Sequence, residues 1–376
     1  MDKFIKGTGI VCEYNPFHNG HAYQIARVKQ MGASFVVCAM SGDFTQRAEP
    51  AFQDKKVRAE NAVKNGADIV LEIPFPFSSM SAEGFAKAGI SILENSGLCD
   101  SFAFGSECGD VDKLTKVASI LDDSFRKEAI NLQKTKPNLG YAQAREMLVC
   151  EKLGKEYSEL LKNPNDILGV EYIRANKSLC PIAVSRKTPR GGFDDEFASS
   201  SYIRNNLFDD KGAFTNVVEY LPDEYSFDGI YPDNKVFYAH MLLSLVQKTP
   251  EYLSDVAEIP VGCEYSIIKC AQTAESYDEL LGLLSSKTLT DAKIRRMLLF
   301  AFFGVKKDMA ISVPEYTNIL ACSELGRKKL KEYAEDRKIT VASRVADIRK
   351  NEKAFCRYNF SRQAREVLEK CRKMSF

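Results

Sequence analysis

Two of the chain's three histidines lie three residues apart, in the run His18-Asn19-Gly20-His21. An apolar stretch that reads as a buried strand precedes this run, and a helix is expected to begin within it. Side chains at i and i+3 share one face of a helix, so both imidazoles can donate hydrogen bonds to the same group. The N–H groups and positive dipole end of a helix N-terminus favour an anion there as well. The pattern therefore predicts a site that stabilises the charge developing at an α-phosphate during nucleotidyl transfer.

A second phosphate-binding pattern is formed by Ser199, Ser200 and Ser201 together with Arg204. Serine is a favoured N-cap residue, so a helix is expected to begin here, with Arg204 on its next turn. Such a helix start can bind phosphate oxygens through hydroxyl, N–H and guanidinium groups. The alternative is an ordinary N-cap beside a surface arginine. In company with the two histidines, the pattern predicts a site for the β- and γ-phosphates.

Other polar positions follow the predicted strands, where a parallel sheet places its ligands. Gly105 ends one strand, and its backbone could pack closely on adenine or ribose. Arg186 ends another strand, and Asn165 precedes a helix. The loop that holds Arg47 and Glu49 could serve an acyl substrate or an acceptor, or it could be purely structural.

The elements that must position these residues alternate between strand and helix over the first half of the chain. Apolar runs predict strands at 8–14, 34–40, 67–73, 101–105 and 181–185. Helical periodicity predicts helices at 20–31, 54–64, 81–93 and 166–177. This alternation is typical of a parallel sheet with helices on its faces, so we expect a Rossmann-like α/β fold.

The pattern changes near residues 220–228. Beyond that point every periodic segment reads as a helix, at 236–246, 277–284, 291–302, 323–336 and 361–373. We therefore predict a nucleotide-binding domain at 1–225, with a helical elaboration at about 110–162, and an all-helical C-terminal domain at 226–376.

The composition excludes several classes of protein. With 45% hydrophobic and 27% charged residues the chain is globular. No apolar run approaches the ~20 residues that span a bilayer, and no signal-peptide pattern is present, so a cytoplasmic protein is expected. The eleven cysteines lack Cys-x-x-Cys spacing, which argues against disulfides and zinc, and most are expected to be buried. The third histidine, His240, is interpreted as a core or helix-face residue, and no metal held by the protein is expected.

Charge is unevenly distributed along the chain. Residues 327–376 hold 16 Lys/Arg and 7 Asp/Glu, a net of +9, whereas the rest of this +1 chain carries −8. Such a segment either faces a polyanion or is a solvated helical tail. If it binds RNA, the candidates lie on its two predicted helices, with two arginines outside it that extend the surface. They are Arg327, Lys328, Lys331, Arg362, Arg365 and Arg372, extended by Arg295 and Arg296.

Taken together, these segments resemble the tRNA(Met) cytidine acetate ligases, a family of His-x-Gly-His nucleotidyltransferases. The resemblance is carried by residues 9–21, 40–42, 46–50, 68–75, 104–107, 165–172 and 200–204. It is weaker at 287–290, 295–298 and 314–316. Two places depart from the family pattern: Ala48 stands where glycine is usual, and the turn around Phe193 lacks a histidine.

The resemblance implies a reaction and a set of binding residues. ATP, with magnesium, and acetate would form acetyl-adenylate, whose acetyl group would pass to the wobble cytidine of elongator tRNA(Met), giving N4-acetylcytidine. His18 and His21 would be catalytic, and no tightly bound cofactor or protein partner is implied. The ATP contacts would be Val11, Cys12, Glu13, Tyr14, Asn15, Pro16, Phe17, His18, Asn19, Gly20, His21, Ala22, Tyr23, Gln24, Gly105, Asn165, Arg186, Ser201 and Arg204.

Two other functions are compatible with the same residues. Another adenylyltransferase of the superfamily would keep the phosphate site but join AMP to a small substrate. A non-catalytic tRNA-binding relative would keep only the fold, although the intact pair His18 and His21 argues against it.

Overall fold

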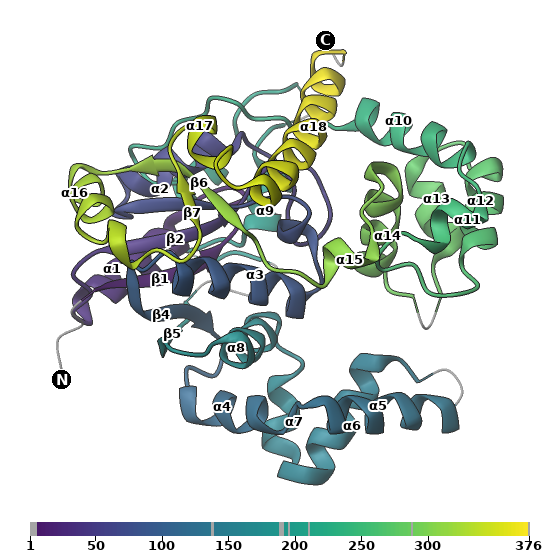
Figure 1. The fold of residues 1–376 in the computed structure, drawn as a ribbon, viewed down its shortest axis with the longest axis horizontal. Coiled ribbons are helices and arrows are strands. Elements are labelled where there is room, and N and C mark those ends of the chain that lie inside the picture. The colour runs from purple at the N-terminus through teal and green to yellow at the C-terminus, as the bar shows by residue number, and fades with distance from the viewer. Residues whose placement is uncertain are drawn as a thin grey trace.

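The computed structural model describes residues 6–136, 139–187, 192–194, 196–209, 211–286 and 289–374. Its centre is a seven-stranded sheet in the order β5-β4-β1-β2-β3-β6-β7 (Figure 1). Neighbouring strands from β5 to β3 run parallel, as the alternation of strands and helices predicted. The strands are β1 Gly7–Cys12, β2 Val36–Ser41, β3 Ile69–Ile73, β4 Cys99–Ser106, β5 Cys180–Ser185, β6 Tyr316–Cys322 and β7 Thr340–Ala342.

The prediction that the C-terminal region is all helical is wrong for β6 and β7. Strand β6 pairs antiparallel with β3, and β7 pairs parallel with β6. Without them β3 would be an exposed sheet edge with unpaired N–H and C=O groups. The pairing is reinforced by Thr317 Oγ1, which donates to the main-chain oxygen of Glu72 at 2.7 Å. The sheet therefore draws strands from both sides of the change of pattern near residue 226.

Helices cover both faces of the sheet because the central strands are apolar on both sides. Val36, Cys38 and Met40 of β2 share a core with α1 (Asn19–Gln30) and α2 (Lys55–Lys64). Val37 and Ala39 of the same strand share the other core with α3 (Ala82–Asn95). Helix α8 (Pro164–Ala175) packs beside α3. These layers hold the carboxyl ends of β1, β2, β4 and β5 at one edge of the sheet.

Two groups of helices flank this layered core (Figure 1). The predicted elaboration at 110–162 is confirmed as helical, in α4 Val111–Ile120, α5 Asp123–Thr135, α6 Tyr141–Leu153 and α7 Lys155–Leu160. A second group comprises α10 Lys235–Val246, α11 Pro250–Ser254, α12 Glu264–Thr273, α13 Tyr277–Leu284 and α14 Asp291–Phe303. The other helices are α9 Ser200–Asn206, α15 Lys307–Ala310, α16 Glu324–Glu332, α17 Val345–Ile348 and α18 Glu352–Met374.

The cysteines are all free thiols, but their burial differs from the prediction. Cys38, Cys99 and Cys371 are buried, five are half-buried, and the thiols at positions 150, 180 and 356 are exposed. Within the described ranges, no helix is both long and apolar enough to cross a membrane.

Candidate active site

His18 and His21 cap the first turn of α1 through reciprocal hydrogen bonds. His18 is the N-cap residue, and its Nδ1 accepts from the main-chain N–H of Gly20 at 3.1 Å. The main-chain N–H of His18 in turn donates to Nδ1 of His21 at 3.3 Å. This is the geometry of a capping box, built here from two imidazoles. Because each Nδ1 accepts a hydrogen bond, a neutral ring must carry its proton on Nε2.

The two imidazole rings stack, with centroids 3.7 Å apart and planes inclined by 25°. Burial, and to a smaller extent the charges of Arg186 and Arg204, lower the pKa of His18 to about 3. The pKa of His21 is also well below 6.5, through burial first and then the charges of His18 and Arg186. Both rings are therefore neutral at pH 7, and each offers one Nε2–H donor on the same face of the helix turn.

The segment between β1 and α1 supports the pair from beneath. Tyr14 is buried, with its ring 4.8 Å from that of His21 and 4.9 Å from that of Phe17. Its backbone lies in the left-handed region at φ 47°, which turns the chain sharply after the strand. Asn15 Oδ1 accepts from the main-chain N–H of Phe52 at 2.7 Å, which ties this segment to the loop after β2.

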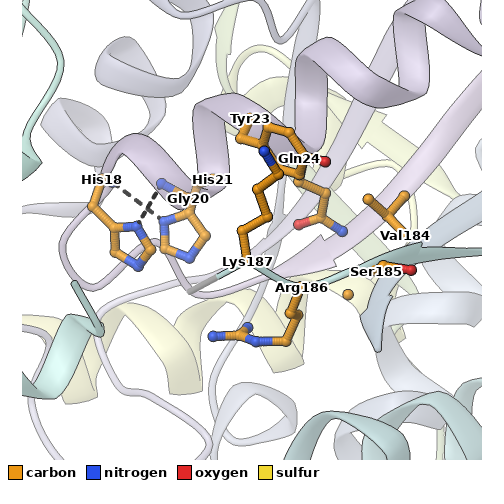
Figure 2. A pocket seen from close by; sticks show the side chains of 10 residues that line it. His18, Gly20, His21, Tyr23, Gln24, Val184, Ser185, Arg186 and Lys187 are labelled. Carbon is orange, nitrogen blue, oxygen red and sulfur yellow. Dashed lines mark hydrogen bonds between the residues drawn. The ribbon is translucent and has the colours of Figure 1, made fainter. Parts of the chain in front are cut away.

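A cavity opens beside the two histidines (Figure 2). It is lined by seven residues that the sequence assigned to ATP, namely His18, Gly20, His21, Tyr23, Gln24, Gly105 and Arg186. It is also lined by Val184, Ser185 and Lys187, which the sequence reasoning missed. Val184 and Ser185 end β5 and Lys187 follows it, and because β5 pairs with β4 the order of strands in the sheet would have indicated them. By contrast, Val11, Tyr14 and Phe17 are buried in the core.

Arg186 is held in place by a chain of polar contacts across the carboxyl edge. Its Nη1 donates to Asn165 Oδ1 at 3.2 Å, and Asn165 Nδ2 donates to Glu107 Oε1 at 2.7 Å. Figure 2 shows the Arg186 side chain reaching from the end of β5 toward the imidazole rings. A Cβ atom at Gly105 would stand 3.3 Å from Cγ of Arg186, so glycine leaves room for this side chain.

The turn after β4 depends on Asp166, a residue that the sequence reasoning did not single out. Its buried Oδ1 accepts from Ser106 Oγ at 2.5 Å and from the main-chain N–H groups of Glu107 at 3.0 Å and Cys108 at 3.3 Å. A buried carboxylate is stable there because N–H and O–H donors surround it. Asp166 thereby fixes the position of Glu107, and with it the chain of contacts to Arg186.

Arg204 lies on α9, and its charge also acts on His18. Its Nη1 donates to the main-chain oxygen of Asn15 at 2.5 Å, and its Nη2 contacts Ser201 Oγ at 3.3 Å. Neither of these hydrogen bonds engages a carboxylate. The pKa of Arg204 is lowered by burial, raised by Glu13, lowered by Arg47 and raised by Glu49. A half-buried guanidinium bound only to neutral groups is suited to an anionic ligand.

The loop between β2 and α2 is closely pinned. Thr45 N–H donates to the main-chain oxygen of Glu49 at 2.9 Å, and Ala48 N–H donates to that of Thr45 at 2.9 Å. Gln46 N–H donates to Glu13 Oε1 at 2.6 Å, which joins the loop to the end of β1. Ala48 adopts φ 58°, a left-handed conformation that favours glycine. Arg47 is exposed at the tip of this loop.

Arg58 of α2 holds the base of the same loop, and sequence reasoning missed it. It is fully buried and donates to main-chain oxygens on three segments. Its Nη1 contacts Glu13 at 2.5 Å, its Nε contacts Gln53 at 3.0 Å, and its Nη2 contacts Ser41 at 3.2 Å. One guanidinium therefore joins the ends of β1 and β2 to the loop. Only the structure reveals this role, because a helical arginine ordinarily reads as a surface residue.

The predicted RNA-binding residues do not form one surface. Arg327, Lys328 and Lys331 are exposed on α16, but the main-chain N–H of Ser323, its N-cap, donates to the oxygen of Asp68 at the amino end of β3. Helix α16 therefore lies at the sheet edge opposite the two histidines. On α18, Arg362 is exposed.

The remaining four arginines of this set are engaged within the protein. Arg296 is buried and pairs with Glu258, with Nε and Oε2 3.8 Å apart. Arg372 is also buried, and its Nη2 donates to the main-chain oxygen of Ala51 at 2.6 Å. The other contacts are ion pairs of Arg295 with Glu49 and of Arg365 with Asp54.

Some predicted features lie outside the described residues, namely 188–191 and 195 in the loop after β5 and 287–288 before α14. Phe193, at the departure from the family pattern, is exposed and lies 4.5 Å from the ring of Tyr202. His240 is exposed on α10, which confirms the helix-face interpretation. In the part of the chain that the structure describes, no group of three or more His, Cys, Asp and Glu side chains is placed to hold a metal ion.

The fold and the paired histidines at the start of α1 define a nucleotidyl transferase. A family model described as HIGH Nucleotidyl Transferase matches residues 5–374, nearly the whole chain. Among curated relatives, the tRNA(Met) cytidine acetate ligase of Caldanaerobacter subterraneus is 34% identical, covering 91% of this chain and 89% of the relative. That of Acetivibrio thermocellus is 33% identical, covering 92% and 90%. The chain belongs to the tRNA(Met) cytidine acetate ligase family, as the resemblance predicted.

Solved structures agree with this assignment. The crystal structure of Thermotoga maritima TmcAL bound with alpha-thio ATP matches with a TM-score of 0.86 and 28% identity, covering 96% of this chain and 93% of that one. The apo form of the same protein matches with a TM-score of 0.88 over the same shares of the two chains. The predicted nucleotidyltransferase fold is thus confirmed.

The lowered pKa of His18 predicts a pH dependence of stability. In the unfolded chain His18 binds a proton below pH 6.5, whereas in the folded protein it stays neutral to about pH 3. Its contribution to stability is therefore complete above pH 6.5 and is lost as the pH falls below that value. Between pH 7 and pH 5.5 the loss should be about 1 kcal/mol. His18→Asn keeps a cap acceptor but cannot titrate. Between pH 7 and pH 5.5 the free energy of unfolding of this variant should therefore fall by about 1 kcal/mol less than that of the wild type. Parallel pH profiles from denaturant titrations would contradict the burial effect.

The left-handed backbone at Ala48 predicts that glycine there is stabilising. Ala48→Gly should raise the free energy of unfolding by about 0.5–1 kcal/mol, because the strain of Cβ in this region is removed. Ala51→Gly, in the same loop at an ordinary φ, should lower it instead. Denaturant midpoints of the two variants give the comparison, and an equal loss in both would show that Ala48 is unstrained.

Proposed function

We propose that this protein forms acetyl-adenylate from ATP and acetate and transfers the acetyl group to a cytidine of tRNA(Met). The observation that carries the proposal is the stacked, neutral pair His18 and His21, whose two Nε2–H donors lie within the influence of the Arg186 charge, as His18 also does for Arg204. Such donors favour a phosphate whose charge increases in the transition state. The names of the curated relatives support the choice of acetate and tRNA(Met).

In the first step, a carboxylate oxygen of acetate attacks the α-phosphorus and the bond to the bridging oxygen of the β-phosphate breaks. The two Nε2–H groups and the N-terminus of α1 donate to the α-phosphate oxygens, which stabilises the crowded transition state. Arg186, and Arg204 together with Ser201, bind the departing pyrophosphate. A magnesium ion bound to the triphosphate would neutralise part of its charge.

In the second step, the exocyclic N4 of cytidine attacks the acetyl carbon. The bond from that carbon to AMP breaks, N4 releases a proton to solvent, and the products are N4-acetylcytidine and AMP. We assign this acceptor to the wobble position of elongator tRNA(Met), following the family resemblance. An adenylyltransferase that acts on a small substrate would instead leave AMP attached to its product, so the fate of AMP separates the two functions.

The first prediction from this proposal concerns His21. His21→Ala should reduce acetate-dependent ATP–pyrophosphate exchange about 100-fold or more, the usual effect of losing one preorganised donor. His240→Ala, at an exposed histidine outside the site, is the matched control and should exchange at the wild-type rate. A folded His21→Ala protein with near-normal exchange would contradict the catalytic role. Pyrophosphate release at the full rate without acetate would contradict the assignment of acetate as a substrate.

The second prediction concerns the route of tRNA to the site. Three basic side chains are exposed on α18, namely Arg362, Lys370 and Lys373. The same helix contacts the end of the loop between β2 and α2, through the ion pair of Arg365 with Asp54. Reversing the three exposed charges should weaken tRNA binding and flatten its salt dependence, because fewer counterions are released. Acetyl-adenylate formation should stay at the wild-type rate, since none of the three touches the ATP site.

The matched control for this experiment is the basic set on α16. Reversing Arg327, Lys328 and Lys331 changes the net charge equally but at the opposite edge of the sheet. We expect a smaller loss of tRNA affinity from this variant. Equal losses from both variants would mean that only net charge matters, and no loss from the α18 variant would exclude that helix from the tRNA interface.

A further inference from the structure

An ion pair between Arg295 and Glu49 joins the second helical group to the loop between β2 and α2. Arg295 lies on α14, and its Nη1 contacts Oε1 of Glu49, a residue 246 positions earlier in the chain. Each side chain is 30% exposed, so neither is fully removed from water. The charges of both groups also act on two stacked tyrosines, Tyr238 and Tyr277, whose ring centroids are 4.3 Å apart.

The loop that holds Glu49 and the side chain of Arg204 both contact Asn15. Asn15 accepts from Phe52 N–H through Oδ1 and from Arg204 through its main-chain oxygen. The carboxylate of Glu49 is therefore a potential competitor for Arg204. Consistent with this, its charge raises the pKa of Arg204, although burial of the guanidinium has the larger, opposite effect.

A carboxylate bound to Arg204 would oppose ATP binding. Arg204 is now hydrogen-bonded to neutral oxygens, and this leaves its positive charge available to an anion. If Glu49 turned to Arg204, it would neutralise that charge and occupy donors that phosphate oxygens need. In the structure Glu49 is paired with Arg295 instead.

We propose that Arg295 is a positioning residue of the adenylation reaction, which sequesters Glu49 so that Arg204 stays free for the phosphates of ATP. By its position in the sequence, Arg295 was predicted to be a possible tRNA contact. The inference rests on the proposed use of ATP. It differs from a purely structural role in one respect. Loss of Arg295 should weaken ATP binding only because Glu49 keeps its charge, so removing that charge should restore ATP binding.

The test is a double-mutant cycle on Arg295→Met and Glu49→Gln, read by acetate-dependent ATP–pyrophosphate exchange without tRNA. Methionine keeps the length of the side chain but removes its charge. Arg295→Met should raise the KM for ATP roughly 5-fold, the upper end of what a partly exposed ion pair is worth, with a smaller change in kcat. The double variant should return to within about 2-fold of the wild-type KM. Arg295→Lys, which preserves the charge, should lie close to wild type.

The matched control is Arg296→Met, which breaks the neighbouring ion pair with Glu258 on the same helix. It should lower thermal stability but leave the KM for ATP unchanged. A double variant that is as impaired as Arg295→Met would overturn the proposal, because the pair would then matter only as a link between two parts of the fold. An Arg295→Met variant with normal exchange but a reduced salt slope of tRNA binding would overturn it in favour of tRNA contact.

Failure of the inference can be told apart from failure of the proposed function. If the wild-type protein shows no acetate-dependent exchange, the proposed reaction is wrong. The affinities of the wild-type, Arg295→Met and double-variant proteins for a non-hydrolysable ATP analogue, measured by calorimetry, still test the inference. Weaker binding in Arg295→Met with recovery in the double variant supports sequestration, and equal binding in all three contradicts it.

Discussion

The structure of the active site depends on the reciprocal hydrogen bonds by which His18 and His21 cap helix α1. Each imidazole uses Nδ1 to satisfy a main-chain N–H, so only Nε2 is left to face a ligand. Burial and the neighbouring arginines keep both rings neutral, which makes them donors of one hydrogen bond each. The same contacts that begin the helix therefore also fix the tautomers. In the proposed reaction this constraint preorganises the two donors, so that little reorganisation is needed when ATP binds.

The rest of the fold brings two guanidinium groups to those donors and keeps nearby carboxylates from pairing with them. Parallel strands deliver Arg186 from β5 to the same edge, and α9 delivers Arg204. Both guanidinium groups hydrogen-bond to neutral oxygens, whereas the nearby carboxylates are engaged elsewhere: Glu13 with Gln46 N–H, and Glu49 with Arg295. Keeping carboxylates occupied is as important for an anion site as supplying cations, because an unengaged carboxylate would compete with the substrate.

Sequence alone predicted the parts of this protein that local patterns determine. The histidine pair, the N-cap serine at α9 and the parallel strands each have a short-range signature. The buried contacts that hold the loops, made by Arg58 and Asp166, join segments distant in sequence and therefore had no such signature. Strand β6 was missed for the same reason. It forms by pairing with the open edge of β3, which lies about 250 residues earlier in the chain. The net charge of the basic C-terminal segment follows from the sequence, but the positions of its arginines in the fold do not. Net charge does not indicate which arginines are buried.

The most direct test of the account is the protonation state of the imidazoles, measured by nitrogen-15 NMR on protein labelled at histidine. With only three histidines in the chain, each ring can be assigned by substitution. The account predicts that at pH 6 His18 and His21 are both neutral, with Nε2 protonated. Addition of a non-hydrolysable ATP analogue should shift the Nε2–H signals of the pair and leave His240 unchanged. Imidazolium signals from His18 or His21 at pH 6, or protonation of either ring at Nδ1, would contradict the central claim.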